Sequence, residues 1–548
     1  MEATMKDEKQ FNHICDLDGL TDKGRTMNTT RPFSACSYCL WNRRRFLVRT
    51  GAAAIGTMGL LAEPGIVAAA LSRPRVRIRV VYALHAPQQT QPDWPNKGFD
   101  FVPVMDEINR DLAKHCSGFE FVHSLASGKE QAEKIVAEDQ AAGNIDGYLV
   151  YQMNCWNRVV QTLAATGKPV LYADFQYGGS GGFLVYTATF LRNGQPNVGF
   201  VASSDRRDLI NAVKCFRIVR TGGSVADFVA ATAQVRRKAT PVPGQAAGNP
   251  DAIKCLSPDD CLRRFRESKI LAVRNQEAGP AVEIMGIRIQ YVPFSELNEA
   301  WQNADRDEAR AVADQWSRAA RKIEGVSPET LEASAAMYLA EKSLLKKHGA
   351  QGITINCLGG FYGGHLHAYP CMGFHQLNNE GMVGGCECDV RSAVTMLAGN
   401  ILTQGRPGYI SDPVIDTAKR QIIYAHCVAS NRVFGPQGPA NPFDILTHSE
   451  DRQGASVRSI LPVGYITTSL EFEQARKEIL LHRARAVGND PDDRACRTKL
   501  CAEPLGDIEK LFRYWDQWGW HRVTFYGDLR EPVYALADAL GWKVVEEA

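Results

Sequence analysis

The regular alternation of short apolar strands and amphipathic helices after residue 75 constrains the fold of this chain more than any other feature. Strands are predicted at 75–84, 119–125, 145–153 and 168–175, with helices between them at 101–116, 128–143 and 157–167. Helices of this length between consecutive strands are typical of βαβ units with right-handed crossovers and a parallel sheet. We therefore predict a Rossmann-like α/β domain over residues 73–175.

The loop after the first predicted strand argues against a dinucleotide site. It reads HAPQQTQPDWPNKGF, which is polar and rich in proline, and no Gly-x-Gly-x-x-Gly follows the strand. Without those glycines the backbone lacks the tight turn and close approach that a pyrophosphate needs.

The chain is too long for one core. With 548 residues it should form two to four domains. Strands at 269–275, 287–294 and 352–358, with helices within 303–324 and 328–347, predict a second parallel-sheet Rossmann-like α/β domain over 176–360. The remainder, 361–548, carries many of the histidines and many Gly/Pro turns.

The first 72 residues predict an export signal rather than a domain. Arg43, Arg44 and Arg45 are followed by Phe46-Leu47, then by an Ala/Gly-rich apolar run that ends in small residues. This order is typical of a secretory signal, and the arginine pair resembles a twin-arginine signal. The alternative, an uncleaved membrane anchor, is disfavoured by Pro64 and Gly65. We expect a periplasmic or otherwise extracytoplasmic protein that meets the membrane only through this signal.

Charge and cysteine usage exclude two broad classes. The formal net charge is +2, so nothing indicates a nucleic-acid partner. Fifteen cysteines are scattered without repeated spacing, which disfavours a disulfide scaffold.

Imidazole and carboxylate groups gather late in the chain. Of twelve histidines, five fall between residues 365 and 448, and they are His365, His367, His375, His426 and His448. The same window holds Glu380, Glu387, Asp389, Glu450 and Asp451, and His521 follows near the end. Such a mixture suits Mn, Fe, Co or Zn. No pair has the His-Glu-x-x-His spacing of a zincin.

The segment GGCECDVRSAVTML, residues 384–397, places two acids before a predicted helix. If Val383–Cys388 ends a strand, Asp389 caps the helix at an edge where α/β sheets bind ligands. On an extended backbone Glu387 and Asp389 share a face, which suits a metal-and-base pair. A plain cap beside a surface acid is the alternative. Cys386 and Cys388 are interpreted as small buried residues in preference to zinc or disulfide roles.

Two further segments bring polar side chains together. The stretch 447–464 contains His448, Glu450, Asp451 and Arg452, which predict a recognition loop or, alternatively, a solvated turn. The strand 422–430 ends near His426, which follows Asp412 and Asp416 and could equally be a core histidine.

Four segments, in this order, resemble the L-fucose isomerase and L-arabinose isomerase superfamily. They are Glu387-Cys388-Asp389 before the AVTML helix, TQGRPGYISDP at 403–413, IIYAHC at 422–427, and His521 with FYGDLREPV and the closing ALGWKVVE. The similarity covers roughly residues 350–548, and the preceding α/β regions agree with the family layout. It implies an L-fucose isomerase-like α+β domain over 361–548.

The resemblance implies a divalent metal, usually Mn²⁺, held by two carboxylates and the late histidine. By position, Asp389 would be a carboxylate ligand, His521 the imidazole ligand and His426 a site histidine. The implied activity is aldose–ketose interconversion through an enediol. A cation on the sugar oxygens stabilises the developing charge, and a carboxylate accepts the proton. We predict Asp389 and Glu387 as catalytic residues.

One departure leaves alternatives open. Relatives carry a glutamate, both ligand and base, about two dozen residues before the Asp, and residues 359–379 contain no acid. His365, His367 or Glu387 could supply the ligand. Otherwise the protein could be an exported, non-catalytic sugar-binding protein, or catalyse another metal-dependent sugar reaction such as epimerisation.

Relatives form trimers or hexamers in which the first domain of one subunit covers the site of another. We therefore expect a homo-oligomer with a carbohydrate substrate. The loop QQTQPDWPNKGFDF at 88–101, with Trp94, is a candidate for that covering role or, alternatively, an ordinary exposed loop. The predicted substrate-binding residues are His448, Glu450, Arg452 and Trp94.

Overall fold

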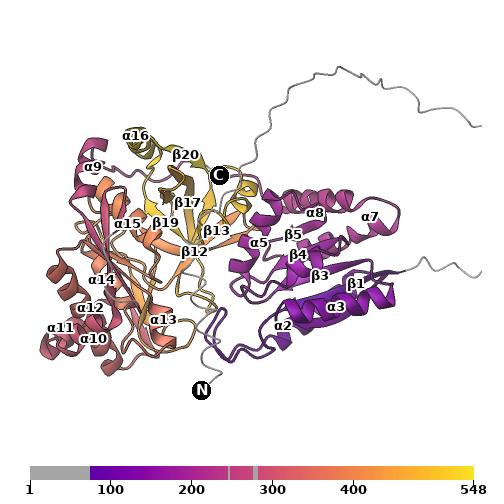
Figure 1. Cartoon of the computed structure of the whole chain (residues 1–548), viewed down its shortest axis with the longest axis horizontal. Helices are drawn as coiled ribbons and strands as arrows, with labels where there is room; N and C mark the ends of the chain where they lie inside the picture. Colours follow the sequence, from indigo (N-terminus) through magenta and orange to yellow (C-terminus); the bar gives the residue numbers. More distant parts are fainter. Residues whose placement is uncertain (1–74, 245–246, 276–281) are drawn as a thin grey trace, which may run out of the picture.

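The computed structural model describes residues 75–244, 247–275 and 282–548 (Figure 1). The predicted export signal at 1–72, with Cys36 and Cys39, lies outside these residues. Within them, no helix is long and apolar enough to cross a membrane.

The first sheet is parallel and has the strand order β2-β1-β3-β4-β5. Its strands are β1 (Val76–Ala83), β2 (Phe119–Ala126), β3 (Gly147–Gln152), β4 (Val170–Asp174) and β5 (Val198–Val201). The alternating helices are α2 (Val102–His115), α3 (Lys129–Ala142), α4 (Val159–Ala164) and α5 (Ser180–Arg192). Every residue of β4 is buried, as expected for a parallel strand covered on both faces.

This sheet continues beyond residue 175, because β5 pairs with β4. The helices α6 (Arg206–Val213), α7 (Phe216–Arg220) and α8 (Val225–Ala239) follow β5, and α8 packs on it. The stretch 208–220 is divided between α6 and α7.

The second sheet has the order β11-β10-β6-β8-β7. Its members are β6 (Lys269–Arg274), β7 (Val282–Ile284), β8 (Ile287–Pro293), β10 (Gly352–Ile355) and β11 (Val383–Gly385), and only β7 is antiparallel. The strands predicted at 269–275 and 287–294 and the two predicted amphipathic helices are confirmed, whereas the strand predicted over 352–358 ends at Ile355 and a helix begins at Cys357. The helices are α9 (Pro258–Arg266), α10 (Phe294–Gln302), α11 (Arg306–Ala319), α12 (Pro328–His348), α13 (Cys357–Tyr362) and α14 (Cys371–Asn379).

The third sheet is largely antiparallel, in the order β16-β19-β12-β13-β18-β17-β20. Its strands are β12 (Tyr409–Asp416), β13 (Gln421–His426), β16 (Ile466–Glu473), β17 (Glu478–Asn489), β18 (Thr498–Pro504), β19 (Arg522–Tyr526) and β20 (Lys543–Glu546). Because β16 also pairs with β17, six of these strands close into a ring. A small sheet of β9 (Lys322–Glu324), β14 (Phe443–Leu446) and β15 (Ser456–Ser459) lies beside it. The predicted α/β class with parallel sheets is thus confirmed at that level.

Helix α15 (Val390–Leu402) connects the second sheet to the third. It packs closely on β19, since a Cβ added at Gly399 would come within 2.1 Å of the Phe525 ring. Asp389 is the N-cap of this helix, and His521 directly precedes β19. The contact between α15 and β19 therefore places Asp389 and His521 near each other. Helix α16 (Arg530–Leu540) follows β19.

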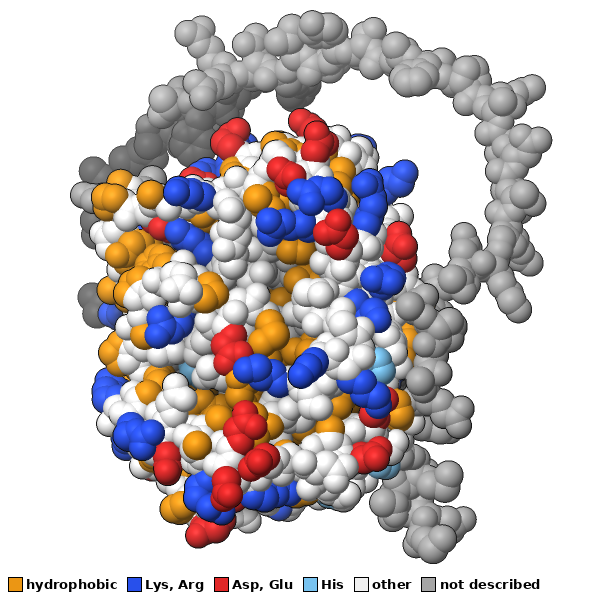
Figure 2. All heavy atoms as spheres, turned by 90° about the vertical axis from the view of Figure 1, so that its left-hand side faces the viewer, with side chains coloured by type: hydrophobic (Ala, Val, Ile, Leu, Met, Phe, Trp, Pro, Cys, Tyr) orange, Lys and Arg blue, Asp and Glu red, His pale blue; other side chains and the backbone are white. Residues whose placement is uncertain are grey.

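Charged side chains of both signs are interspersed with apolar ones over the face in Figure 2. No large region of a single charge stands out on that face.

Candidate metal centre

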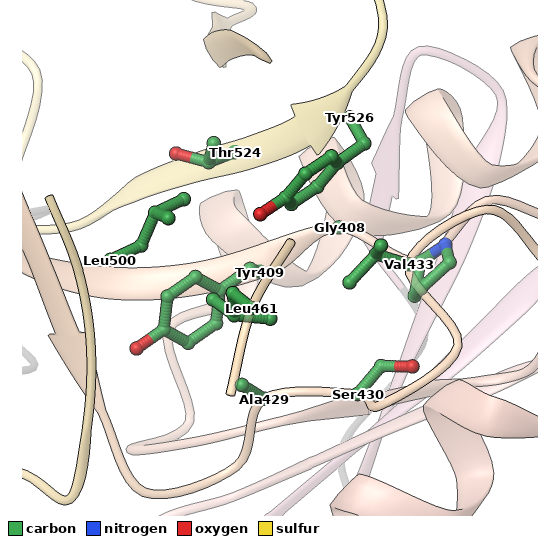
Figure 3. A pocket seen from close by; sticks show the side chains of 10 residues that line it. Gly408, Tyr409, Ala429, Ser430, Val433, Leu461, Leu500, Thr524 and Tyr526 are labelled. Carbon is green, nitrogen blue, oxygen red and sulfur yellow. The ribbon is translucent and has the colours of Figure 1, made fainter. Parts of the chain in front are cut away.

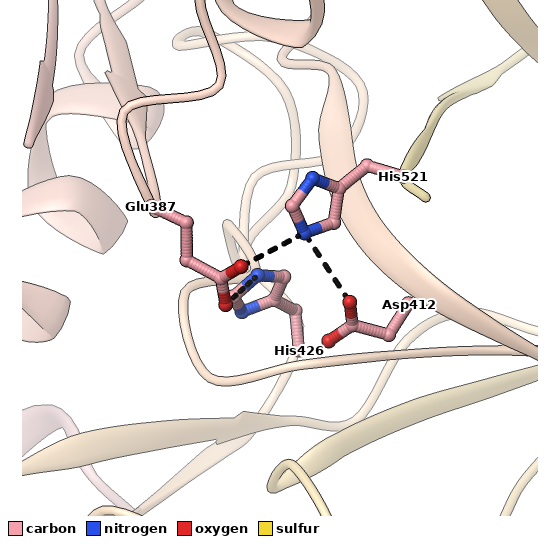
Figure 4. A group of neighbouring side chains, drawn as sticks. All are labelled: Glu387, Asp412, His426 and His521. Atoms are coloured by element: carbon pink, nitrogen blue, oxygen red, sulfur yellow. Dashed lines mark ion pairs between the residues drawn. The ribbon is translucent and has the colours of Figure 1, made fainter. Parts of the chain in front are cut away.

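Four side chains from four segments converge at the junction of the second and third sheets (Figure 4). They are Glu387, Asp412, His426 and His521, and each offers one ligand atom within 4.8 Å of the others. Among the described residues, this is the group of histidine, cysteine and acidic side chains with a spacing that could hold a metal ion.

Backbone geometry aims Glu387 into the group. Strand β11 ends at Gly385, and Glu387 and Cys388 then adopt φ values of 63° and 53°. Two successive non-glycine residues in the left-handed region are energetically unfavourable, and such strain gathers at functional sites. The turn is fixed by the Cys388 amide, which donates to the Ile355 carbonyl at 2.9 Å. The prediction that Glu387 and Asp389 share one face of an extended strand is therefore wrong, because the backbone between them is left-handed.

Strand register brings Asp412 and His521 together. In the antiparallel pair of β12 and β19, Ser411 lies opposite Arg522. One step further along the same register places Asp412 beside His521. His426 is the last residue of β13, the other neighbour of β12.

The imidazole of His521 lies at the centre of the charges. Its Nε2 is 3.2 Å from Asp412 Oδ1 and 3.4 Å from Glu387 Oε2. The Nε2 of His426 is 3.8 Å from Glu387 Oε1. Both histidines are at least 96% buried.

Asp389 contacts the other side of the same ring. Its Oδ2 accepts from His521 Nδ1 at 2.9 Å and from Ser392 Oγ at 2.8 Å, while Oδ1 accepts from the Ser392 amide at 3.0 Å. The prediction that Asp389 caps the following helix is confirmed. Both of its oxygens are engaged in these contacts, and it lies outside the group of four.

The surrounding carboxylates shift the pKa values. Burial alone would lower the pKa of His521, but Asp389, Asp412 and Glu387 raise it well above its usual value. Burial would raise the pKa of Glu387, but His521 and His426 bring it below its usual value. The cluster thus favours a positive charge at its centre, whether a proton on His521 or a metal ion.

The donor set suits a divalent cation of the Mn, Fe, Co or Zn kind, because it combines carboxylate oxygen with imidazole nitrogen. In addition, the Nε2 atoms of His426 and His521 are buried and make no hydrogen bond with the described residues. A buried polar atom without a partner calls for a ligand. The bond from His521 Nδ1 to Asp389 is the outer contact that commonly orients a ligating histidine.

The structure therefore brings together Glu387, His426 and His521 from the predicted metal set. It adds Asp412 and places Asp389 behind His521. His365 lies elsewhere, with its ring stacked on Phe294 at a centroid distance of 5.6 Å. Its carbonyl accepts from Asn298 Nδ2.

The predicted recognition loop forms a buried polar cluster. His448 Nδ1 lies 3.3 Å from Asp451 Oδ1, and Tyr362 donates to Glu450 Oε2 at 2.9 Å. Burial raises the pKa of Glu450 to about 8, with smaller contributions from Asp93 and Glu387. Burial lowers the pKa of His448, but Asp451 and its neighbours raise it to about 9.

Arg452 and Trp94 have structural partners. Arg452 Nη1 pairs with Asp493 Oδ2 at 2.9 Å. Trp94 is 7% exposed and belongs to the large apolar core that contains residues of the second and third sheets. Its loop contacts the C-terminal region of the same chain, because the backbone amide of Lys97 donates to the Glu450 carbonyl and the Ala495 amide donates to the Pro95 carbonyl.

Sequence reasoning did not assign Asp412, although it noted the residue. A signal was present. Asp412 follows Glu387 by about two dozen residues, the spacing that the resemblance implies between its glutamate and aspartate. The same spacing counted back from Asp389 reaches a stretch without an acid, residues 359–379.

The cysteines beside Glu387 are largely buried, as interpreted from the sequence. Cys386 is 4% exposed and its Sγ lies 3.3 Å from that of Cys357, while Cys388 is half-buried. Both Cys386 and Cys357 are free thiols.

A small apolar hollow lies elsewhere in the third sheet (Figure 3). Tyr409, Leu461, Leu500 and Tyr526 are among its lining residues. None of the four side chains of the candidate metal centre lines it.

Comparison with known proteins points to sugar isomerases. The chain is 25% identical over 267 residues to a sulfoquinovose isomerase of Clostridium sp. (strain MSTE9), covering 46% of this chain and 57% of that protein. It is 26% identical over 247 residues to a sulfoquinovose isomerase of Priestia aryabhattai, covering 40% and 52%. The chain thus matches little more than half the length of these relatives. No protein-family model matches it.

Similarity to solved structures is slight. A LacI-family regulatory protein from Chloroflexus aggregans is 11% identical, with 52% of this chain and 78% of that chain covered and a TM-score of 0.15. A solute-binding protein of an ABC transporter from Burkholderia multivorans is 11% identical, with 53% and 85% covered and a TM-score of 0.17. These scores support no conclusion on fold or function.

Proposed function

We propose that this protein is a metal-dependent aldose–ketose isomerase that acts on a sugar of the sulfoquinovose class. The observation that carries the proposal is the buried group of Glu387, Asp412, His426 and His521. The relatives named sulfoquinovose isomerase support the same reaction class.

The spacing of the acids removes the main argument for a non-catalytic sugar-binding protein. That argument rested on the absence of an acid upstream of Asp389 in residues 359–379. Glu387 and Asp412 have the order and separation that the resemblance implies, and both contribute to one cluster. We therefore assign Glu387 and Asp412 as the two carboxylate ligands and His521 as an imidazole ligand. Asp389 would orient His521.

A divalent cation held by these residues, Mn²⁺ by our proposal, would stabilise negative charge on the sugar oxygens as the C2 proton leaves. Glu387 is the candidate general base, because His521 and His426 keep the pKa of its carboxyl below the usual value and so hold it ionised and able to accept a proton. Its turn of left-handed backbone holds the carboxylate at the centre of the site.

Glu450 is the candidate general acid. Burial holds its pKa at about 8, so this carboxyl is protonated at neutral pH, whereas Glu387 is ionised. Two carboxyl groups whose environments drive their pKa values apart suit an acid and a base. Tyr362 donates to Glu450 and fixes its orientation.

Sulfoquinovose is a glucose in which a sulfonate replaces the 6-hydroxyl group. The C1 and C2 chemistry proposed here is independent of that substituent, and the relatives' name alone supports the sulfonate. Localisation outside the cytoplasm, a trimer or hexamer, and coverage of the site by residues 88–101 remain parts of this proposal. The contacts of that loop with Glu450 and Ala495 support a covering role within one chain.

The test is hydrogen exchange at C2. The full chain, loaded with Mn²⁺ in D₂O, would be given sulfoquinovose and a panel of unsubstituted aldoses, and the sugars followed by proton NMR. We expect loss of the C2 proton signal together with ketose formation, and both should cease when EDTA removes the metal.

Three results would separate the alternatives. Exchange with a new aldose but no ketose would indicate epimerisation. Sugar binding without exchange, unaffected by EDTA, would favour a binding protein. Unchanged exchange in a Glu387→Gln variant would overturn the assignment of the base, with Glu380→Gln as the matched control on a nearby acid outside the cluster.

A further inference from the structure

The two histidines of the metal centre present opposite kinds of nitrogen to it. His521 Nδ1 contacts Asp389 Oδ2 at 2.9 Å. A carboxylate can only accept, so the proton of a neutral His521 resides on Nδ1 and Nε2 carries the lone pair. This is the tautomer that binds a metal through Nε2.

His426 has the reverse arrangement. The backbone amide of Cys427 donates to His426 Nδ1 at 3.0 Å. A backbone N–H can only donate, so Nδ1 carries the lone pair and the proton of the neutral ring resides on Nε2. His426 therefore points an N–H, and not a lone pair, into the site.

That N–H has no acceptor in hydrogen-bond geometry among the described residues. His426 is 2% exposed, and its Nε2 is 3.8 Å from Glu387 Oε1, beyond hydrogen-bond range. Leaving a buried donor unpaired costs about 1–3 kcal/mol. An oxygen that enters the site from outside would supply the missing acceptor.

We infer that His426 is not a metal ligand but a hydrogen-bond donor to a sugar hydroxyl or carbonyl oxygen, and that Glu387, Asp412 and His521 alone supply the protein ligands. The inference rests on the proposed function, since the acceptor is an oxygen of the sugar. Three protein ligands also leave coordination positions open for substrate, as catalytic metal sites require.

The geometry explains why His426 keeps this tautomer. To bind a metal through Nε2, the ring would need its proton on Nδ1, facing the Cys427 N–H. Two donors would then oppose each other in a buried position. The hydrogen bond from the Cys427 amide to His426 Nδ1 thus selects the tautomer that carries its proton on Nε2.

The first experiment counts imidazole nitrogens on Mn²⁺ alone, without sugar. The full chain would be labelled with ¹⁵N-histidine, loaded with Mn²⁺ and studied by pulsed electron–nuclear double resonance. We expect one directly bound ¹⁵N, unchanged in His426→Gln and absent in His521→Gln. Two bound nitrogens in the wild type, or loss of one in His426→Gln, would overturn the inference.

The second experiment separates the donor from the rest of the ring. Glutamine retains an N–H donor, whereas leucine removes it and keeps a similar bulk. We expect both His426→Gln and His426→Leu to bind Mn²⁺ within about threefold of the wild type. For C2 exchange, kcat/KM should fall about 10- to 100-fold in the leucine variant and be largely restored in the glutamine variant.

Failure of the inference and of the proposed function are distinguishable. Equal losses in the two variants, or a large loss of Mn²⁺ affinity in His426→Leu, would overturn the donor role even if the wild type exchanges the C2 proton. A single bound nitrogen in a wild type that exchanges no sugar would uphold the ligand set and reject the isomerase.

Discussion

At the metal centre, the contact that each histidine makes through Nδ1 decides whether its Nε2 can bind a metal. The Nδ1 atom of His521 is hydrogen-bonded to Asp389, and its Nε2 faces Glu387 and Asp412. His426 has the opposite polarity because of its neighbour's amide. The chemistry of the site is therefore set as much by outer contacts as by the ligands.

An Asp389→Asn substitution tests this outer contact. Asparagine caps helices as well as aspartate does, but its single carbonyl oxygen cannot serve both the Ser392 amide and His521. We expect Mn²⁺ affinity to fall about 10- to 100-fold in a calorimetric titration, with little loss of thermal stability.

The matched control is Asp205→Asn. Asp205 also caps a helix, accepting from the Arg207 amide at 2.9 Å, and it is not part of the cluster. Its replacement should leave the affinity unchanged. Equal Mn²⁺ affinity in the Asp389→Asn variant and the wild type would show that the contact does not orient His521.

Glu450 predicts an alkaline limit of activity. A general acid must be protonated, and burial places the pKa of this carboxyl at about 8, so kcat/KM should decline as the pH rises through about 8. A pH–rate profile should lose this limb in Glu450→Gln. The bond from Tyr362 lowers the pKa of Glu450, so Tyr362→Phe should move the limb to higher pH. A shift to lower pH would contradict the assignment.

The sequence identified residues of the site only where a histidine or an acid stood at a predicted strand end or in a motif of the resembled family. Glu387, His426 and His521 were identified from strand-end and motif positions. Asp412 was not assigned, although its separation from Glu387 was a usable signal. Its proximity to His521 has no local signal, because it arises from the register of β12 and β19, between residues about a hundred apart in sequence. The left-handed turn at Glu387 and Cys388 has no glycine to signal it.

At the scale of secondary-structure elements, helix α12 carries an uncompensated acid. Glu341 is fully buried against α14, where a Cβ at Gly373 would lie 2.2 Å from its Oε2. Neither carboxyl oxygen has a hydrogen-bond partner among the described residues. Burial raises the pKa of Glu341 well above its usual value, so the folded protein holds this group neutral.

A Glu341→Met substitution should therefore stabilise the protein in a pH-dependent way. A carboxyl whose pKa is raised on folding contributes most to stability below its unfolded pKa of about 4.3 and loses that contribution as the pH rises to the folded pKa. The free energy of unfolding of the variant, relative to wild type, should grow by about 1.4 kcal/mol per pH unit over that interval. Urea unfolding at pH 5, 6 and 7 measures it.

Glu299→Met, at an exposed position of α10, is the control and should show no such slope. A constant difference between Glu341→Met and wild type across these pH values would mean that Glu341 is already ionised in the folded state.

Elements with strong periodicity were predicted well. The parallel strands β3 and β4 are mostly apolar because both of their faces are covered, and α2 and α11 have the pattern of amphipathic helices. The ring of β12, β13 and β16–β19 was not foreseen. Its closure depends on the pairing of β16 with both β17 and β19, which local pattern does not encode.

At the scale of the whole molecule, the first and third sheets share one apolar core. Tyr172 and Phe183 from the first part belong to the same cluster as Ile422 and Leu500 from the third. The second and third sheets share another cluster. The third sheet therefore joins the other two. We expect the described parts of the chain to unfold together and not as independent domains.

Arg236 of α8 makes a buried polar link across the first of these junctions. Its Nε and Nη2 donate to Glu509 at 2.8 and 2.6 Å, and Nη1 donates to the Phe200 carbonyl at 3.0 Å. The guanidinium also lies over the Phe200 ring at 3.7 Å. A bidentate pair with a stacked ring is the arrangement for which arginine is suited and lysine is not.

An Arg236→Leu substitution should destabilise the molecule as a unit, by about 2–4 kcal/mol, because it leaves Glu509 without its buried partner. Arg237→Leu is the control. Arg237 is 67% exposed and 3.8 Å from the same carboxylate, so its loss should cost less than about 1 kcal/mol. Thermal unfolding followed by far-ultraviolet circular dichroism and by tryptophan fluorescence should give coincident single transitions for the wild type and both variants. If instead Arg236→Leu lowered only one of two separated transitions, the first sheet would unfold independently, and the shared core would not couple the parts of this chain.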